Sequence, residues 1–400
     1  MKIKELHILF FVLFLHAFAS AFTGFYEGGT LNPGTVRGGL VTLFVLYFIS
    51  RRFRVDNKVV GFLVIYLIYL GFLTFLSSSF YTSFYLYIGV FISLMMFPIG
   101  FYYIYNEERL FQLSKVLLYV LAFITGTVLV SNILGVGTSD YLEDSFYFGG
   151  GRVNITKTMV ILLFSAPIYL YMEKASFNRR MAIIVYLTAL AICLIGIKRS
   201  VLLALVVGVG IFLIFGPNLK RSAKYVAAGG FLFLLSLPLY GDLFTERFQA
   251  REERIQITEE TLDAEARYNE VFMVTTAIEQ GSWKHRLIGS ELFNDREFFN
   301  TRRMLHTDYM ILLNGSGVFG FFGWFIFLGL LLMYKVSLYK RIEKNDFIQI
   351  LNAVFWMLIA AQLLISISGT VYSITLRSYL FLLLGAILCV MKKEASVDVR

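Results

Sequence analysis

Apolar runs that approach the length of a membrane crossing recur along the whole chain, and they constrain its fold more than any other feature. A hydrocarbon core about 30 Å thick is crossed by roughly 20 apolar residues in a helix. Such runs form helices rather than strands, because backbone groups left unpaired in lipid are costly. The 58% hydrophobic content also exceeds the apolar share of globular domains, which is about 45–50%. The sequence therefore predicts an all-α polytopic membrane protein.

We expect about twelve transmembrane spans, nine before and three after one long polar segment. The predicted spans are 6–22, 36–50, 59–76, 84–105, 116–134, 155–171, 181–197, 201–215, 225–240, 310–334, 348–367 and 370–391. This divides the chain into a membrane domain at 1–240, a large outer loop at 241–306 and a second membrane part at 307–400. The first span also ends like a signal-peptide cleavage site, but we favour an uncleaved span.

Basic residues gather in the short gaps between spans, and they account for the net charge of +9. Cytoplasmic loops of membrane proteins are rich in Lys and Arg, so this excess indicates topology and not nucleic-acid binding. Twelve spans with both termini cytoplasmic place these gaps inside, including the one that Lys335 and Lys340 mark. Lys198 and Arg199 are the exception, because the same count puts them outside. The bias toward basic cytoplasmic loops does not explain a basic pair on the outer side, so this pair is a candidate site.

The large loop is predicted to be partly helical. A helical stretch begins at Thr258 and runs to Gln280, with Gly281 as its C-cap. One face of this helix is predicted to pack on the membrane domain, with an arginine at one end: Arg267, Val271, Val274 and Ile278. The loop carboxylates are expected to be solvated, as is His285; they include Glu252, Glu253, Glu259 and Asp263. Beyond the loop, Gly315, Gly317 and Gly320 predict that the next span starts with a broken or re-entrant piece.

His306 closes the large loop, where the chain re-enters the membrane. Imidazole is the side chain whose charge changes nearest neutral pH, so His306 is the strongest single candidate for proton transfer. The alternative is a structural histidine that caps a helix or bonds a backbone carbonyl. Asp308, two residues later, is predicted to orient His306, to bind substrate or to cap the next helix.

Several cationic residues are predicted on the same side as His306. Arg199 stands at the mouth of two spans, and its rigid fork of donors suits phosphate; the alternative is a side chain that snorkels to the interface. Arg152 follows three glycines whose amides could approach an anion, although the GK[ST] end of a P-loop is missing. Arg377 is ionisable and lies inside the last span. Together with Lys198 and Arg267 they predict a polyanionic ligand. Metal-ligand spacing does not occur, so neither a metal nor another cofactor is expected.

Two motif stretches and the order of the spans carry a resemblance to a known family. Lys198-Arg199-Ser200 opens a span, and His306-Thr307-Asp308-Tyr309 is followed by Leu312-Leu313 and Gly317-Val318-Phe319-Gly320. With the large late loop, these features resemble the bacterial O-antigen polymerase and O-antigen ligase superfamily (Wzy/WaaL type). The last stretch is similar to the family's His-Asn-x-Tyr-Leu…Gly-Ile-x-Gly pattern, and Arg267 with Leu287-Ile288-Gly289 is similar to its Arg…Gly run. Thr307 stands where Asn is common, and Ser290 replaces a Gly.

The resemblance implies a GT-C-like, metal-independent glycosyltransferase in a bacterial inner or plasma membrane. Its substrate would be an undecaprenyl-diphosphate-linked glycan, with membrane lipid and other polysaccharide-assembly proteins, such as a flippase or a chain-length regulator, as further partners. His306 matches the family's essential histidine and Arg199 its essential arginine. We hypothesise that Arg199, Arg152 and Arg267 hold the diphosphate. The favoured activity is polymerisation of a surface polysaccharide such as O-antigen, capsule or exopolysaccharide. The alternatives are an O-antigen ligase that completes lipopolysaccharide and a lipid-linked glycan transporter.

Overall fold

The computed structural model describes residues 3–25, 33–138, 146–151, 154–196, 198–217, 266–299 and 305–397, together with positions 241, 245 and 249. Within these ranges the chain is all-helical. Its main helices are α1 (Ile3–Phe22), α2 (Pro33–Arg52), α3 (Lys58–Thr74), α4 (Phe80–Tyr103), α5 (Glu107–Leu134), α6 (Ile155–Leu163), α7 (Ala166–Met172), α8 (Ser176–Ile195), α9 (Arg199–Phe215), α12 (Ala266–Gln280), α13 (Trp283–Ile288), α14 (Asp295–Phe298), α15 (Asp308–Tyr339), α16 (Asp346–Ser366) and α17 (Ile374–Val397), with the 3-10 turns η1 (Thr23–Phe25) and η2 (Gly149–Gly151).

Among the described residues, nine helical segments are long and apolar enough to cross a membrane. The shorter apolar helices α3 and α9 occupy two more of the predicted spans, which makes eleven in all (nine plus two). The predicted span at 225–240 lies outside the described residues. The expectation of an all-helical, multi-pass membrane protein is confirmed at this level.

Exposed apolar stripes on several helices fit a lipid environment. On α3 and just after it, Ile65, Ile68, Phe72 and Phe75 are each at least 59% exposed and recur at helical spacing. Such a stripe is costly in water. A hydrocarbon environment removes this cost, so the stripe marks a face of α3 that contacts lipid.

The centre of the bundle is the pair formed by α4 and α17, which have more contacts with each other than any other two elements. Glycines on both helices make this close approach possible. A Cβ on Gly100 would lie 2.2 Å from the Leu382 carbonyl oxygen, and one on Gly385 would lie 2.1 Å from the Phe97 carbonyl oxygen. Small residues at a helix crossing let two backbones pack closely, as they do in other membrane bundles. Nearly all of α17 is therefore buried.

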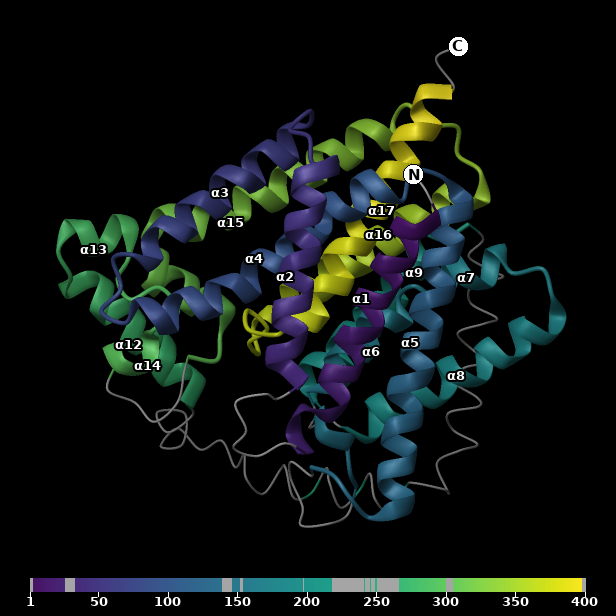
Figure 1. Cartoon of the computed structure of the whole chain (residues 1–400), viewed down its shortest axis with the longest axis horizontal. Coiled ribbons are helices and arrows are strands. Elements are labelled where there is room, and N and C mark those ends of the chain that lie inside the picture. The colour runs from purple at the N-terminus through teal and green to yellow at the C-terminus, as the bar shows by residue number, and fades with distance from the viewer. Residues whose placement is uncertain are drawn as a thin grey trace.

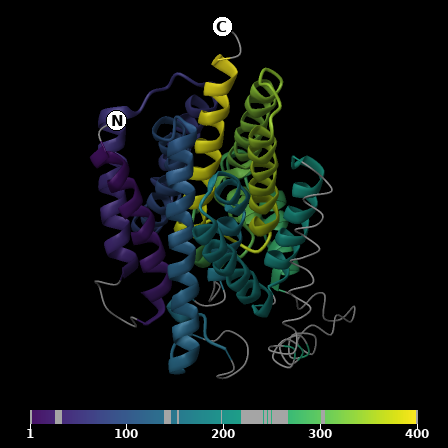
Figure 2. The ribbon, with the colours of Figure 1, turned by 90° about the vertical axis from the view of Figure 1, so that its right-hand side faces the viewer.

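In Figure 1 α1, α2 and α5 stand nearly upright, whereas α3, α4 and α15 are strongly inclined to them, and in both views α1 begins and α17 ends at the same end of the bundle (Figures 1 and 2). The opposite end holds the starts of α9 and α17 and is called the site end below. Figure 1 also shows α3 and α15 side by side on one flank, with α12, α13 and α14 gathered next to them.

Two predicted spans are interrupted. The span at 155–171 is a pair of helices, α6 and α7, separated at Phe164 and Ser165. In α15 the backbone leaves the helical region at Gly317, which has φ 61° and ψ −166°. The broken start of this span, predicted from its glycines, is therefore confirmed.

One predicted inside loop starts later than expected. Lys335 does not mark this loop, because α15 continues to Tyr339 and Lys335 is only 2% exposed. Its ammonium group donates to Asn352 and lies 4.8 Å from the ring centroids of both Tyr339 and Trp356. These partners satisfy the charge inside the bundle, which the sequence pattern alone did not indicate.

The helix predicted in the large loop is only partly described, and its buried face is rotated. It ends at Gln280 as predicted, whereas its start before residue 266 lies outside the described residues. Val274 is fully buried, but Val271 is 42% exposed, so its assignment to the packed face was wrong. Glu270 takes its place, 4% exposed and one turn before Val274. The prediction failed because a carboxylate on the packed face does not register as part of an apolar stripe.

We predict that Gly317→Ala destabilises the protein. A Cβ there would lie 2.5 Å from the Gly289 nitrogen and from the carbonyl group of Leu287, and the positive φ adds strain, so we expect a loss of roughly 1–3 kcal/mol or more. Gly329→Ala in the same helix is the control, because its Cβ would meet nothing within 4 Å. Thermal unfolding of the purified protein is the measurement, and equal midpoints for both variants would contradict the prediction.

Candidate functional site

His306 lies just before α15 and is held by the carboxylate of Glu270 on α12. One carboxylate oxygen accepts the backbone N–H of His306 at 2.8 Å, and the other lies 2.9 Å from the ring Nδ1. Beside an ionised Glu270, which can only accept, the ring nitrogen Nδ1 would be the donor. The Glu270 side chain is 5% exposed and that of His306 is 46% exposed. The arrangement fixes the ring, and Nε2 has no hydrogen-bond partner among the described residues.

Asp308 ties the start of α15 to the loop that precedes α17. Its carboxylate accepts the backbone N–H of Thr370 at 2.5 Å, the hydroxyl of Thr370 at 2.6 Å and the N–H of Val371 at 2.7 Å. Asp308 is 1% exposed, and α15 is capped by Thr307 without a side-chain bond. Its carboxylate is thus fully occupied by this loop, with no bond to the amides of its own helix.

The same loop connects His306 with the start of α9. Gly369 packs against the backbone of His306, since a Cβ on it would lie 2.0 Å from the His306 carbonyl oxygen. The hydroxyls of Ser368 and Ser200 lie 2.8 Å apart, and the buried ammonium of Lys157 donates to the carbonyl oxygens of Ser368 and Gly369 at 2.9 and 2.8 Å. Ser200 follows Arg199 directly. The elements that carry Arg199 and His306 therefore meet at one loop.

The remaining predicted cations lie in different surroundings. Arg199 is exposed and bonds to no other described side chain or carbonyl. Lys198 donates to Asn154. Arg377 is 2% exposed, with its guanidinium carbon 5.2 Å from the ring centroid of Trp324. Arg152 lies outside the described residues, as does the side chain of Arg267, although the backbone of Arg267 belongs to α12.

Sequence reasoning missed the buried carboxylates of the large loop. Asp295 accepts the backbone N–H of Leu305, next to His306, and the hydroxyl of Tyr372 at 3.2 Å. Burial raises the pKa of Asp295 above its usual value. Glu270 is buried as well, whereas Glu252, Glu253, Glu259 and Asp263, the loop carboxylates predicted to be solvated, lie outside the described residues. The available signal was spacing: Glu270 precedes Val274 and Ile278 by one and two helical turns.

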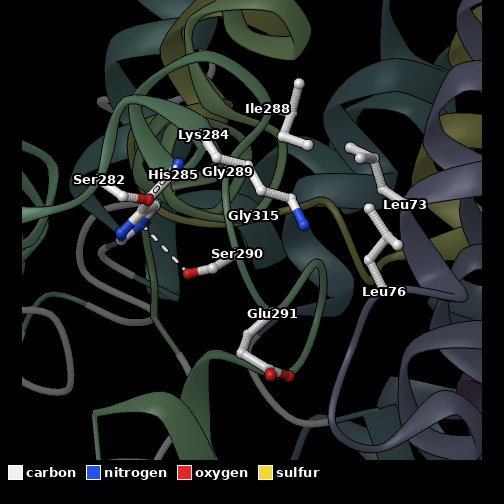
Figure 3. A pocket seen from close by; sticks show the side chains of 10 residues that line it. All are labelled: Leu73, Leu76, Ser282, Lys284, His285, Ile288, Gly289, Ser290, Glu291 and Gly315. Carbon is white, nitrogen blue, oxygen red and sulfur yellow. Dashed lines mark hydrogen bonds between the residues drawn. The ribbon is translucent and has the colours of Figure 1, made fainter.

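A pocket of about 190 Å³ lies between α13, the end of α3 and the break in α15 (Figure 3). His285 lines it and is not the solvated residue that we expected: its Nε2 lies 3.1 Å from the Ser290 hydroxyl, and burial lowers its pKa. Leu73 and Leu76 form an apolar wall. The volume is below the roughly 300–1,000 Å³ of typical ligand pockets.

The fold defines a class: a helical, multi-pass membrane protein in which α12, α13 and α14 pack against α15 and the half-exposed His306 lies just before α15. Comparison of the chain with protein-family models and with curated proteins finds no match. Within the described ranges, no three side chains of His, Cys, Asp and Glu gather as a metal site would require.

We predict that Asp308→Asn loosens the loop before α17. The amide keeps part of the acceptor capacity but loses the charge, and hydrogen bonds to a charged group contribute about 1.5–3 kcal/mol. We expect a loss of stability of roughly that size. Asp346→Asn is the matched control, because Asp346 also starts a helix but is exposed. The unfolding temperatures of the two variants are the measurement. An unchanged midpoint for Asp308→Asn would contradict the view that the Asp308 carboxylate holds the loop before α17.

We predict that Glu291, which joins the large loop to the turn after α3, makes a pH-dependent contribution to folding stability. Burial by itself would raise its pKa, but hydrogen bonds from Asn294, Ser77 and Ser78 outweigh it and lower the pKa below 4.5. A carboxyl group whose pKa is lowered by folding stabilises the fold at pH values above its pKa in the unfolded chain. This stability is lost as the pH falls through its pKa in the folded protein.

Glu291→Gln should therefore lower stability at pH 7, by about 1 kcal/mol. The difference from the wild type should shrink as the pH falls below the usual carboxyl value of 4.5. Thermal unfolding between pH 7 and pH 3 checks this, with the exposed Glu279→Gln as the control. A difference that stays constant over this range would rule out the ionised carboxylate as its source.

Proposed function

We propose that this protein is a glycosyltransferase that uses a polyprenyl-diphosphate-linked glycan, and that it polymerises surface polysaccharide at the outer face of a bacterial plasma membrane. The observation that carries the proposal is the junction at Ser368 and Gly369. One side of it bonds Ser200, next to Arg199, and the other packs against His306. A structure with these residues at opposite ends of the bundle would have excluded a shared site.

The residues at this junction suit the chemistry of transfer from a lipid diphosphate. The diphosphate is a stabilised leaving group, so the protein needs mainly cations beside it and a base for the acceptor hydroxyl. Arg199 is exposed and free of described partners, and His306 has a free Nε2. In the proposed step, Nε2 takes the acceptor proton, the acceptor oxygen bonds to the anomeric carbon with inversion, and the bond to the diphosphate breaks.

Two further features support the family on which the proposal draws. The segments that carry the resemblance, at Leu287-Ile288-Gly289 and Gly317, pack backbone against backbone. Ser290 also donates its N–H to the Asn314 carbonyl oxygen at 2.8 Å. Arg267 belongs to the same helix as Glu270, three residues earlier. A role for Arg267 and Arg152 at the diphosphate, and for Arg377 beneath it, is part of the proposal.

The proposed topology has twelve spans in a GT-C-like arrangement, with both termini cytoplasmic and the site end outside. An even number of crossings fits the position of the start of α1 and the end of α17 at one end of the bundle. Arg52 lies at that end, because it pairs with Glu5 in the first turn of α1 at 3.3 Å, in agreement with the excess of positive charge on cytoplasmic sides.

Ligation of a finished glycan to a lipid A-core needs the same diphosphate site and is the second candidate. In a deletion strain, single repeats on the core indicate a polymerase, whereas long chains left on undecaprenyl diphosphate indicate a ligase. Transport of a lipid-linked glycan is the third candidate. Movement of labelled lipid between leaflets, without formation of a new glycosidic bond, would show that the protein is a transporter.

We predict that His306→Ala lowers the rate of chain extension by roughly 10²–10⁴-fold and that Arg199→Ala lowers it by roughly 10²–10³-fold. The assay supplies the purified protein with a lipid-diphosphate oligosaccharide and reads chain length on a gel. Controls are His7→Ala and Arg180→Ala, which remove exposed side chains remote from the site end. Normal glycan ladders with either site variant would refute the assignment.

A further inference from the structure

The Glu270 carboxylate contacts His306 at two points, one on its backbone and one on its imidazole ring. One oxygen holds the backbone N–H and the other holds Nδ1, at 2.8 and 2.9 Å. The carboxylate comes from α12, a different element, and its side chain is 5% exposed, whereas the imidazole is 46% exposed. Solvent therefore reaches the ring, while the groups that fix it are shielded from water.

We infer that Glu270 is the positioning residue that makes His306 a base, by holding its ring in the Nδ1–H tautomer with Nε2 directed to the acceptor. This inference rests on the proposed function, because it names what prepares the base of that reaction. A neutral imidazole carries one hydrogen and has one free lone pair. Its Nε2 accepts a proton only while the hydrogen is on Nδ1. A carboxylate beside Nδ1 enforces this state and stabilises the imidazolium that forms.

The position of Glu270 also makes the base depend on the large loop. Val274, one turn further along α12, is fully buried, so α12 is docked where Glu270 reaches His306. Arg267 lies three residues before Glu270 in the same helix. Docking of α12 therefore brings the carboxylate to His306 and carries Arg267 toward the same end of the bundle. A site assembled in this way is complete only when the loop helix is seated.

Replacement of Glu270 by Gln separates tautomer control from folding. The amide keeps the size of the carboxylate but offers one acceptor and one donor group. With its oxygen on the backbone N–H of His306, its NH₂ group faces Nδ1 and requires a lone pair there. The ring hydrogen then moves to Nε2, and the nitrogen that faced the acceptor becomes a donor. The base is then lost, although the size of the side chain is unchanged.

The test uses the full-length protein in lipid nanodiscs, labelled with ¹⁵N-histidine. The chain has four histidines, so the signals of His306 are identified by their loss in His306→Ala. We expect ¹⁵N shifts of an Nδ1–H ring in the wild type and of an Nε2–H ring in Glu270→Gln. With the lipid-diphosphate oligosaccharide as substrate, kcat should fall on the order of 10²–10⁴-fold, with KM for the donor unchanged within about threefold.

Two controls distinguish positioning from a general structural effect. Glu279→Gln, an exposed carboxylate in the same helix, should change neither the tautomer nor kcat. Thermal unfolding of Glu270→Gln shows whether the variant is folded, and a folded variant with the Nε2–H ring and a lost kcat supports the inference. A variant that keeps the Nδ1–H ring and the wild-type kcat overturns it.

The outcome for His306→Ala separates this inference from the proposed function. An inactive His306→Ala together with a fully active Glu270→Gln refutes only the role of Glu270. An active His306→Ala refutes the proposed base, and with it the need for a positioning residue. If Glu270→Gln does not fold, the ¹⁵N shifts of the wild type alone decide, because an Nε2–H ring there overturns the inference.

Discussion

The carboxylate of Asp308 joins the first turn of α15 to the loop before α17, and the position of the candidate site depends on this contact. Three hydrogen bonds converge on one buried side chain, two from backbone N–H groups and one from a hydroxyl. The bonds compensate for taking the carboxylate out of water. They also set the loop so that Gly369 lies against His306 and Ser368 reaches Ser200.

Three carboxylates from three helices anchor the short segment around His306. Asp295 on α14 holds Leu305, Glu270 on α12 holds His306, and Asp308 holds the loop on the other side. All three are at most 4% exposed. Buried carboxylates persist when hydrogen bonds occupy them, and here each of the three accepts at least one backbone N–H as well as a side-chain contact. The helices of the large loop are therefore part of the site and not only a cover over it.

The charged side chains around this junction differ in their partners. The buried carboxylates are occupied by hydrogen-bond donors of the protein, and the buried Lys157 by carbonyl oxygens. The guanidinium of Arg199 is exposed and has no described partner. The glycine contact between Gly289 and Gly317 seats α13 on the kink of α15, and it keeps the large loop close to this junction. Rigid seating of this kind is what a preorganised site requires.

The sequence by itself determined the helical spans within the described residues and the broken start of α15, and it singled out His306 and Arg199 as candidates, because apolar length, glycine content and residue type are local properties of the chain. It also indicated that Val274 faces the protein, but it placed Val271 and Lys335 wrongly. The tertiary structure alone decided which buried charges meet. Glu270 precedes His306 by 36 residues, and Asp308 precedes Thr370 by 62. No local pattern encodes such pairings. The hydrogen-bond donors that distinguish a buried carboxylate from a solvated one come from distant parts of the chain, and only the fold brings them together.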